Sequence, residues 1–286
     1  MKEPLILIKG AGDLASGVAH RLHRAGWVPV MTELAQPLVV RRTVSFAEAV
    51  YEGRVAVEGV TAALAENERD IAILRRQGII PVTVDPAGTL VKAMRPAVLV
   101  DASMAKKNQG TRIKDAKFVI ALGPGYCAGR DVHAVVETKR GHYLGRVIVD
   151  GFALADTGEP DPVNGYSHER LLRAPAGGVF RSGRRIGDTV AAGEIVGWVR
   201  EAGDDQAPPP EIPVRTAISG VLRGLIRDGC RVKTALKIGD VDPRGNPEYC
   251  SAISDKARAV AGGVLEALLM LSEGDIKCSF FVESAR

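Results

Sequence analysis

Short apolar runs alternate with longer amphipathic segments along the first 122 residues. The apolar runs lie at 5–8, 28–31, 79–84, 96–100 and 118–122. Each has the length of a strand, and most end at glycine, proline or an acidic residue. Between the first two runs, Leu14, Val18 and Leu22 recur at helical spacing. Strands that alternate with helices predict a Rossmann-like α/β domain with a mostly parallel sheet covered on both faces.

The second half of the chain contains an internal repeat. Residues 174–199 align with residues 216–241, and the matched positions are mainly glycines and valines, such as Gly178 with Gly220 and Val199 with Val241. Two copies of short strands separated by glycine predict a small all-β barrel-sandwich domain. This pattern resembles the lipoyl and biotinyl domains. The connection between the copies contains no lysine to carry a prosthetic group, so we expect neither biotin nor lipoate.

A final helix is predicted over residues 255–271, with Ser254 as its cap and an apolar stripe that would dock on a domain. The expected organisation is a Rossmann-like α/β domain at 1–150, a lipoyl/biotinyl-like β-barrel domain at 151–250, and a C-terminal helix and tail at 251–286. A length of 286 residues favours two domains rather than one.

Charge and composition narrow the classes of function. The net charge is +4, from 38 basic and 34 acidic residues that are interspersed, so no basic tract indicates nucleic-acid binding. No apolar run is long enough for a signal peptide or a membrane span, and we expect a cytoplasmic protein. The cysteines are widely spaced and are expected to be free thiols: Cys127, Cys230, Cys250 and Cys278.

The first predicted strand runs into a glycine turn that opens a helix. Gly10 and Gly12 would let a pyrophosphate approach the backbone, next to Asp13 at the helix start. Glu33 ends the second strand, where dinucleotide-binding folds hold a ribose. The glycine spacing departs from the usual fingerprint, because the third position is Ala15. A purely structural turn remains the alternative.

A second polar region follows the strand at 118–122. Gly123 and Gly125 end this strand, and Asp101 and Lys106 follow the neighbouring one. Since parallel strands place ligands at their carboxyl edge, these residues are expected to converge with Gly10. Further cofactor-binding candidates in the same stretch are Lys139 and Arg140.

Asp131 and His133 are the candidate catalytic residues of this stretch. They lie two residues apart, so on a strand their side chains would share a face. A carboxylate beside the imidazole would raise the histidine pKa and allow proton transfer near neutral pH. Cys127 in the preceding turn is a weaker candidate for a nucleophile, and a small apolar role for it is the alternative.

Several segments together resemble one protein family. They are GAGDLASGVAHRL, RRTVSF, GPGYCAGRDVHAVVETKRGHYLGRV, ERLLRAP, ISGVLRGL, KIGDVDPR and CSAISDKA. This set is similar to the accessory proteins of the selenium-dependent molybdenum hydroxylase system, the family labelled YqeB, which is distantly like XdhC-type maturation factors. The resemblance implies a role in maturing hydroxylases such as xanthine dehydrogenase. It also implies a hydroxylase subunit and other selenium or molybdenum maturation proteins as partners.

Three functions remain open at this point. A maturation factor would bind the molybdenum cofactor, molybdopterin, or a nucleotide-bearing precursor. An NAD(P)-dependent oxidoreductase would use Glu33 on the ribose and His133 as the proton donor. A scaffold would dock a hydroxylase subunit through its barrel and final helix.

Overall fold

The computed structural model describes residues 4–201 and 211–272. The described chain forms two compact units. Unit 1 comprises residues 4–37, 45–157 and 253–272, and unit 2 comprises residues 38–44, 158–201 and 211–252. Most of the connection between the two sequence repeats lies outside the described residues.

A nine-stranded sheet forms the centre of unit 1, in the order β10-β9-β7-β6-β1-β2-β5-β4-β3. Its strands are β1 (Ile6–Lys9), β2 (Val30–Glu33), β3 (Arg54–Val57), β4 (Val60–Leu64), β5 (Ile80–Val84), β6 (Val98–Asp101), β7 (Phe118–Leu122), β9 (Ala134–Val136) and β10 (Val147–Ile148). A separate two-stranded sheet joins β8 (Cys127–Ala128) to β11 (Gly151–Phe152).

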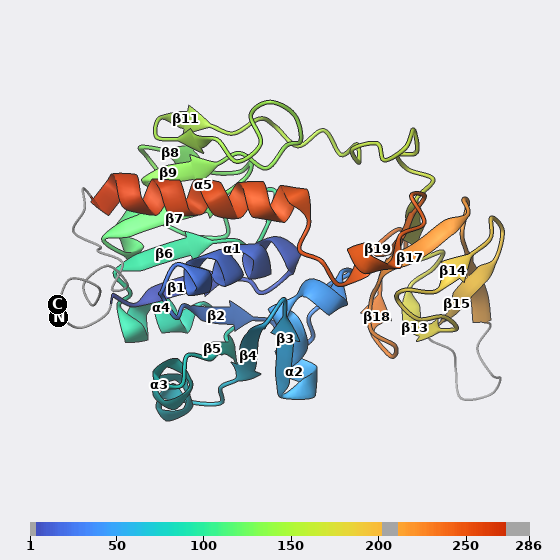
Figure 1. Ribbon diagram of the computed structural model, residues 1–286, viewed down its shortest axis with the longest axis horizontal. Helices are drawn as coiled ribbons and strands as arrows, with labels where there is room; N and C mark the ends of the chain where they lie inside the picture. The colour runs from blue at the N-terminus through green and yellow to red at the C-terminus, as the bar shows by residue number, and fades with distance from the viewer. Residues whose placement is uncertain (1–3, 202–210, 273–286) are drawn as a thin grey trace. The chain divides into compact units, whose positions relative to one another are not determined.

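Helices cover both faces of this sheet. They are α1 (Asp13–Arg24), α2 (Ala49–Glu52), α3 (Glu68–Arg76), α4 (Thr89–Met94) and α5 (Asp255–Ser272), and the same unit has the short 3-10 helices η2 (Phe46–Glu48) and η3 (Ile113–Asp115). The 3-10 helices η1 (Arg42–Val44) and η4 (Pro247–Cys250) belong to unit 2. Helices α1 and α5 lie side by side along the sheet (Figure 1). Residues of α3 and α4 pack on a core that includes Leu7, Leu99 and Val119. Strand residues are buried on both sides, as expected for a sheet between two helical layers.

The predicted parallel sheet is wrong at both of its ends. Strands β4, β5, β2, β1, β6, β7 and β9 run parallel to one another. The edge strands β3 and β10 are antiparallel to β4 and β9. The sheet is therefore mixed. The two-residue turn at Glu58–Gly59 is the reason at one edge, because a turn of that length can only join antiparallel strands.

Residues 63–78 have the polar, glycine-terminated pattern that favours a single helix, but the structure divides them between a strand and a helix. Residues 60–64 form strand β4, and the helix begins only at Glu68. The side chain of Asn67 accepts a hydrogen bond from the backbone N–H of Asp70, which caps this helix. The apolar residues before Asn67 pair with β5 instead, and they are largely buried in the sheet.

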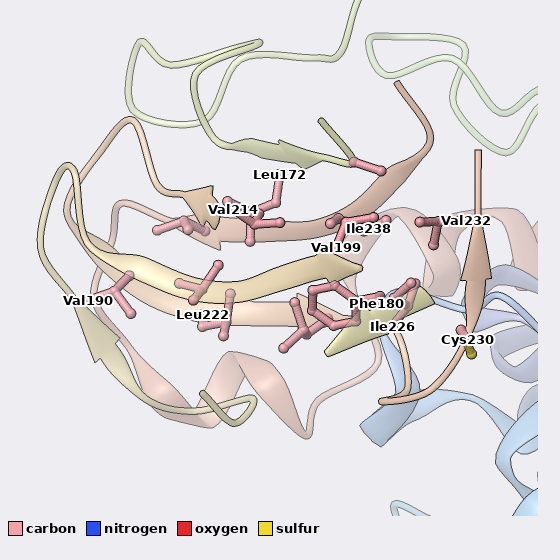
Figure 2. Packing of buried hydrophobic residues seen from close by; sticks show 14 of the residues in the cluster. Leu172, Phe180, Val190, Val199, Val214, Leu222, Ile226, Cys230, Val232 and Ile238 are labelled. Carbon is pink, nitrogen blue, oxygen red and sulfur yellow. The ribbon is translucent and has the colours of Figure 1, made fainter. Parts of the chain in front are cut away.

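Unit 2 is built from two four-stranded antiparallel sheets. One has the order β12-β19-β17-β14 and the other β16-β15-β13-β18. The strands are β12 (Leu171–Arg173), β13 (Gly178–Ser182), β14 (Thr189–Val190), β15 (Ile195–Arg200), β16 (Glu211–Arg215), β17 (Gly220–Leu225), β18 (Arg231–Val232) and β19 (Lys237–Asp242). Figure 2 shows the shared apolar core, in which Phe180 and Val199 from one sheet meet Leu222 and Ile238 from the other.

The two sequence copies exchange short strands between these sheets. Strands β13, β14 and β15 of the first copy correspond in position to β17, β18 and β19 of the second. Strand β14 pairs with β17, and β18 pairs with β13, so each sheet contains strands of both copies. The expected lipoyl-like barrel is wrong, because the described strands form two separate four-stranded antiparallel sheets that do not close into one barrel. Short strands with glycine turns fit either arrangement, and only the pairing distinguishes them.

Helix α5 returns to unit 1. Its predicted apolar stripe is buried, with Ala257, Val260, Val264 and Leu268 all at 1% exposure or less. Ser254 Oγ accepts a hydrogen bond from the backbone N–H of Ala257, as predicted for a cap. Within residues 4–201 and 211–272, no helix has the length and hydropathy needed to cross a membrane.

Candidate functional site

A buried polar cluster lies at the carboxyl edge of the nine-stranded sheet. The adjacent strands β1 and β6 end at Lys9 and Asp101, whose Nζ and Oδ2 atoms are 3.1 Å apart. Lys9 Nζ also donates to Thr111 Oγ1 at 2.7 Å, and that hydroxyl donates to Asp101 Oδ2. Ser103 Oγ donates to Asp101 Oδ1 at 2.6 Å. We call these four residues and the nearby Tyr126 the edge cluster.

Asp101 is ionised in this cluster although it is only 1% exposed. Burial by itself raises the pKa of a carboxyl group. Here the Lys9 ammonium and the hydrogen bonds from Ser103 and Thr111 outweigh burial, and the pKa of Asp101 is lowered. The carboxylate therefore holds together the two ends of the loop that runs from Ser103 to Thr111.

Tyr126 is fully buried, and its hydroxyl makes no hydrogen bond of regular geometry, although Asp101 and Ser103 lie beside it. Its ring belongs to the apolar core that includes Leu99 and Val119. Burial raises the pKa of Tyr126, and the negative charge of Asp101 raises it further. The phenol therefore stays protonated near neutral pH and can donate a hydrogen bond. A buried hydroxyl without a partner costs about 1–3 kcal/mol, so it calls for an explanation.

Gly10 and Gly125 lie in the two turns predicted to bind a ligand. Both are explained by backbone atoms of another part of the chain, which lie close to them. Gly10 has φ +96°, and a Cβ there would lie 2.9 Å from the carbonyl oxygen of Ala102. Gly125 has φ +102°, and a Cβ there would lie 3.0 Å from the carbonyl oxygen of Lys106. The loop after β6 thus occupies the space beside both turns, where the sequence suggested a phosphate.

The amino terminus of α1 is already surrounded by acidic side chains of the chain. Glu33 Oε2 accepts a hydrogen bond from the backbone N–H of Ala11 at 2.8 Å, and Oε1 accepts from Leu34. Asp13 Oδ1 accepts from the backbone N–H of Leu14. Gly12 is the N-cap residue, with extended backbone. Carboxylates favour a helix amino terminus, but they also oppose a second anion there.

Glu137 fixes the turn after β9 at this same edge. Its buried carboxylate accepts hydrogen bonds from the backbone N–H groups of Thr138, Lys139 and Leu154, each at 2.8 Å. Gly123 has φ +70° and packs against the side chain of Thr138. Glu137 is thus a structural clamp, and the side chain of Lys139 points away from the core and is exposed.

The structure does not bring Asp131 and His133 together with the edge cluster. Both precede β9, and His133 exchanges hydrogen bonds with Val119 near the start of β7. Because β7 and β9 are parallel, these two residues lie at the amino edge of the sheet, opposite Gly123. The stretch 123–142 crosses from one edge to the other and back.

The expected pairing of Asp131 with His133 is also absent among the described contacts. Asp131 binds the guanidinium of Arg130 and the backbone N–H of Cys127, and these hydrogen bonds lower the pKa of Asp131. His133 Nδ1 accepts a hydrogen bond from the backbone N–H of Val119 at 3.0 Å. Burial lowers the pKa of His133, the opposite of the expected shift.

Two further cationic candidates form ion pairs elsewhere in unit 1. Lys106 Nζ lies 2.6 Å from Asp156 Oδ2. Arg140 makes two hydrogen bonds to the carboxylate of Asp255, at the start of α5. Neither cation is in the edge cluster. No group of histidine, cysteine and carboxylate side chains that could hold a metal ion occurs within residues 4–201 and 211–272.

The three described cysteines show no sign of a reactive thiol. Cys127, Cys230 and Cys250 are free thiols, as predicted, whereas Cys278 lies outside the described residues. Burial raises the pKa of Cys250, which makes its thiol less reactive. Cys127 is half-buried, and its sulfur lies 3.6 Å from the carbonyl oxygen of Ala128.

Unit 2 contains a second buried charged cluster. Asp240 and Asp242 lie two residues apart on β19 and are 1% and 2% exposed. Asp240 Oδ2 lies 2.9 Å from Arg170 and 2.6 Å from Arg223. Asp242 Oδ2 lies 2.6 Å from Arg244. These ion pairs are typical of a structural network, although the buried Nε of Arg170 has no hydrogen-bond partner among the described residues.

Sequence reasoning missed four of the five residues of the edge cluster. Lys9 ends an apolar run directly before Gly10, and a charged residue at that position could have been noticed. Ser103 and Thr111 are small polar residues in a loop, and no pattern separates them from other loop residues. Tyr126 stands in a glycine-rich stretch, where a single aromatic residue was the available signal.

Comparison with known proteins gives one close match in sequence. The chain is 46% identical over 275 residues to a protein of Escherichia coli strain K12 described as "Uncharacterized protein YqeB". The match covers 96% of this chain and 49% of the relative, so the chain spans about half the length of the curated relative it matches. No protein-family model matches.

Solved structures give only distant matches. An aspartoacylase family protein from Mesorhizobium loti matches with a TM-score of 0.28, and the ectoine utilization protein EutE (DoeB) from Ruegeria pomeroyi with 0.27. A succinylglutamate desuccinylase/aspartoacylase from Rhodobacter sphaeroides also matches with 0.27. Each is 13% identical, and each match covers 84% of this chain and 85% of the other. TM-scores this low assign neither the fold nor the activity of those proteins to this chain.

The function expected from the family resemblance is corrected by these comparisons. The similar E. coli protein is described only as uncharacterized, so it supplies no hydroxylase-maturation role to this chain. The expected assignment to a selenium and molybdenum hydroxylase maturation system is therefore wrong. The shared sequence motifs identify a relative, but they do not assign an activity to this chain.

Proposed function

We propose that unit 1 binds a small molecule through a carbonyl oxygen at the carboxyl edge of its sheet. The observation that carries this proposal is the buried hydroxyl of Tyr126, which makes no hydrogen bond of regular geometry although the ionised Asp101 and Ser103 lie beside it. The carboxyl edge of parallel strands is where α/β proteins bind their ligands. An acceptor oxygen from a ligand would satisfy the phenol and remove the cost of its burial.

Lys9 supports the same type of ligand. An ammonium group has three N–H donors, and two of those of Lys9 are used by Thr111 and Asp101. The side chain of Lys9 is 20% exposed, so the chain's own groups do not enclose it completely. Lys9 and Asp101 neutralise each other, which favours a neutral acceptor such as an amide or ketone over a phosphate. The carboxylates of Glu33 and Asp13 at the amino terminus of α1 also disfavour phosphate.

Ligand-observed saturation-transfer NMR on the full chain tests this proposal. The probes are small amides, ketones, carboxylates, inorganic phosphate, NAD(H) and NADP(H). We expect amides or ketones to bind, and Tyr126→Phe to weaken their binding about fivefold, which is the worth of one hydrogen bond of about 1 kcal/mol. Tyr143→Phe is the matched control, because Tyr143 is 55% exposed. Binding of every carbonyl probe unchanged by Tyr126→Phe would refute the proposal.

The stability of the same variant is a second measurement. Because the hydroxyl of Tyr126 is buried without a partner, Tyr126→Phe should raise the free energy of unfolding of the ligand-free protein by about 1 kcal/mol. Urea unfolding measures this change. A loss of stability would mean that the hydroxyl already has a partner and needs no ligand.

The cofactors and partners expected from the sequence stay predictions. Molybdopterin and NAD(P) can be titrated beside the carbonyl probes, and both carry phosphate, which the charges near α1 disfavour. Co-purification from cells that express a molybdenum hydroxylase subunit would test the predicted protein partner.

A further inference from the structure

The loop that follows β6 is anchored at both ends but not in its middle. Asp101 Oδ1 accepts hydrogen bonds from the N–H and Oγ of Ser103. Asn108 Oδ1 accepts from the backbone N–H groups of Gly110 and Thr111, both at 2.8 Å. Residues 104–107 lie between these two anchors. We call them the flap.

Few interactions hold the flap in place, and one of them is the hydrogen bond that Gln109 Nε2 donates to the carbonyl oxygen of Lys107. Lys106 forms an ion pair with Asp156 in which the two side chains are 76% and 37% exposed. Pairs with this exposure stabilise by about 0.2–1 kcal/mol. No residue from 103 to 110 is buried. Segments with little buried surface open locally at low cost in free energy.

Backbone strain also favours opening of the flap. Met104 has φ +55°, a conformation that costs a residue with a side chain about 1–2 kcal/mol. Neighbouring contacts must maintain this conformation while the flap is closed. The side chain of Met104 is itself 39% exposed, so it contributes little packing in return.

The flap lies against the turn that leads to the buried phenol. A Cβ at Gly125 would lie 3.0 Å from the carbonyl oxygen of Lys106 and 3.1 Å from the Cα of Lys107, which is tighter than an ordinary contact. Tyr126 is the next residue and is fully buried. We propose that residues 104–107 open as a flap and admit the ligand to the hydroxyl of Tyr126 and the ammonium of Lys9. This inference rests on the proposed function for its ligand, but not for the motion.

Nitration of tyrosine by tetranitromethane, followed by peptide mass mapping, tests the motion without any ligand. In the closed state Tyr126 is inaccessible, whereas the exposed Tyr143 serves as the internal reference. Lys106→Met removes the ion pair with Asp156 and should raise the nitration rate of Tyr126 about 1.4- to 5-fold, the factor that corresponds to a surface ion pair. Lys107→Met is the matched control, since no ion pair of Lys107 occurs among the described residues, and the rate should not change.

The outcomes separate this inference from the proposed function. Equal nitration of Tyr126 in the parent, Lys106→Met and Lys107→Met would overturn the flap. Faster nitration of Tyr126 in Lys106→Met would support the flap. If the affinity for the carbonyl probes were also the same in Tyr126→Phe as in the parent, the proposed ligand would be refuted. Hydrogen exchange of the amides at 103–107 provides a second readout, because it should accelerate in Lys106→Met alone.

Discussion

At the scale of single residues, the direction of each hydrogen bond decides the charge that a side chain carries. Asp101 accepts all of its hydrogen bonds and is ionised. The Nδ1 atom of His133 is also an acceptor, for the backbone N–H of Val119, so the imidazole must be neutral at that nitrogen. If Nδ1 of His133 were protonated, its N–H would face the backbone N–H of Val119, and both groups would be donors. This geometry agrees with the lowered pKa of His133 and opposes the raised pKa that the sequence predicted.

His133 makes the stability of the protein depend on pH. Its pKa is about 6.5 in the unfolded chain and lower in the folded protein, so the unfolded chain binds more protons as the pH falls. The contribution of His133 is therefore complete above pH 6.5 and is lost as the pH falls through the folded pKa. We expect the free energy of unfolding to fall less between pH 7 and 5 in His133→Asn than in the parent, measured by urea unfolding.

A matched variant separates this effect from general acid destabilisation. His142 is exposed, and His142→Asn should preserve the pH dependence of the parent. His20 has a pKa lowered by burial as well, so some dependence will remain in His133→Asn. An identical slope for the parent and His133→Asn would contradict the assignment of a neutral, hydrogen-bonded imidazole.

At the scale of elements, close backbone approach explains why helix α5 contains glycine. A Cβ at Gly263 would collide with the carbonyl oxygen of Gly145, and a Cβ at Gly17 on α1 would lie 2.9 Å from the Cβ of Ala257. Helix α5 thus packs tightly on α1 and on the turn before β10. Gly262 is different, because no atom lies within 4 Å of the Cβ that it would carry.

The neighbouring glycines Gly262 and Gly263 should respond to alanine in opposite directions. Gly263→Ala forces α5 away from Gly145 and should lower the free energy of unfolding by about 1–3 kcal/mol. Gly262→Ala meets no neighbour and should raise it by up to about 1 kcal/mol, since alanine is the better helix former. Thermal unfolding followed by circular dichroism measures both. Equal effects of the two variants would show that helix propensity, and not packing, controls this helix.

At the scale of the whole chain, unit 2 includes a segment from early in the sequence. Residues 38–44 join residues 158–252, and Val40 accepts a hydrogen bond from the backbone N–H of Leu225 on β17. The buried ion network lies in this same unit. Burial alone would raise the pKa of Asp240, but the charges of Arg223, Lys237 and Arg170 lower it overall.

Asp240→Asn should therefore destabilise unit 2. Removing one partner of a buried ion pair leaves uncompensated charge and costs about 3–5 kcal/mol. Asp228→Asn is the control, because Asp228 is 52% exposed and pairs with Arg181 on the surface. Calorimetry and proteolysis mapped to residues 158–252 should show loss of unit 2 in Asp240→Asn, with little change in the control. A change below about 1 kcal/mol would show that the network contributes nothing to stability.

The sequence by itself determined much of the local structure. Apolar runs of strand length predicted β1, β5, β6 and β7, and helical spacing predicted α1 and α5. It also placed Asp101 at the carboxyl end of a buried strand, where polar groups gather. These predictions succeed because periodicity and strand length depend on the burial of nearby side chains, which the order of residues specifies.

Only the tertiary structure decided which partners those elements have. The pairing of β3 with β4 and of β10 with β9 made the sheet mixed, and strand exchange divided unit 2 into two sheets. The position of His133 opposite Gly123 and the contact of Gly10 with Ala102 depend on long-range packing as well. Glycine allows close approach equally to a phosphate or to the chain's own backbone, so its meaning depends on what occupies the space beside it.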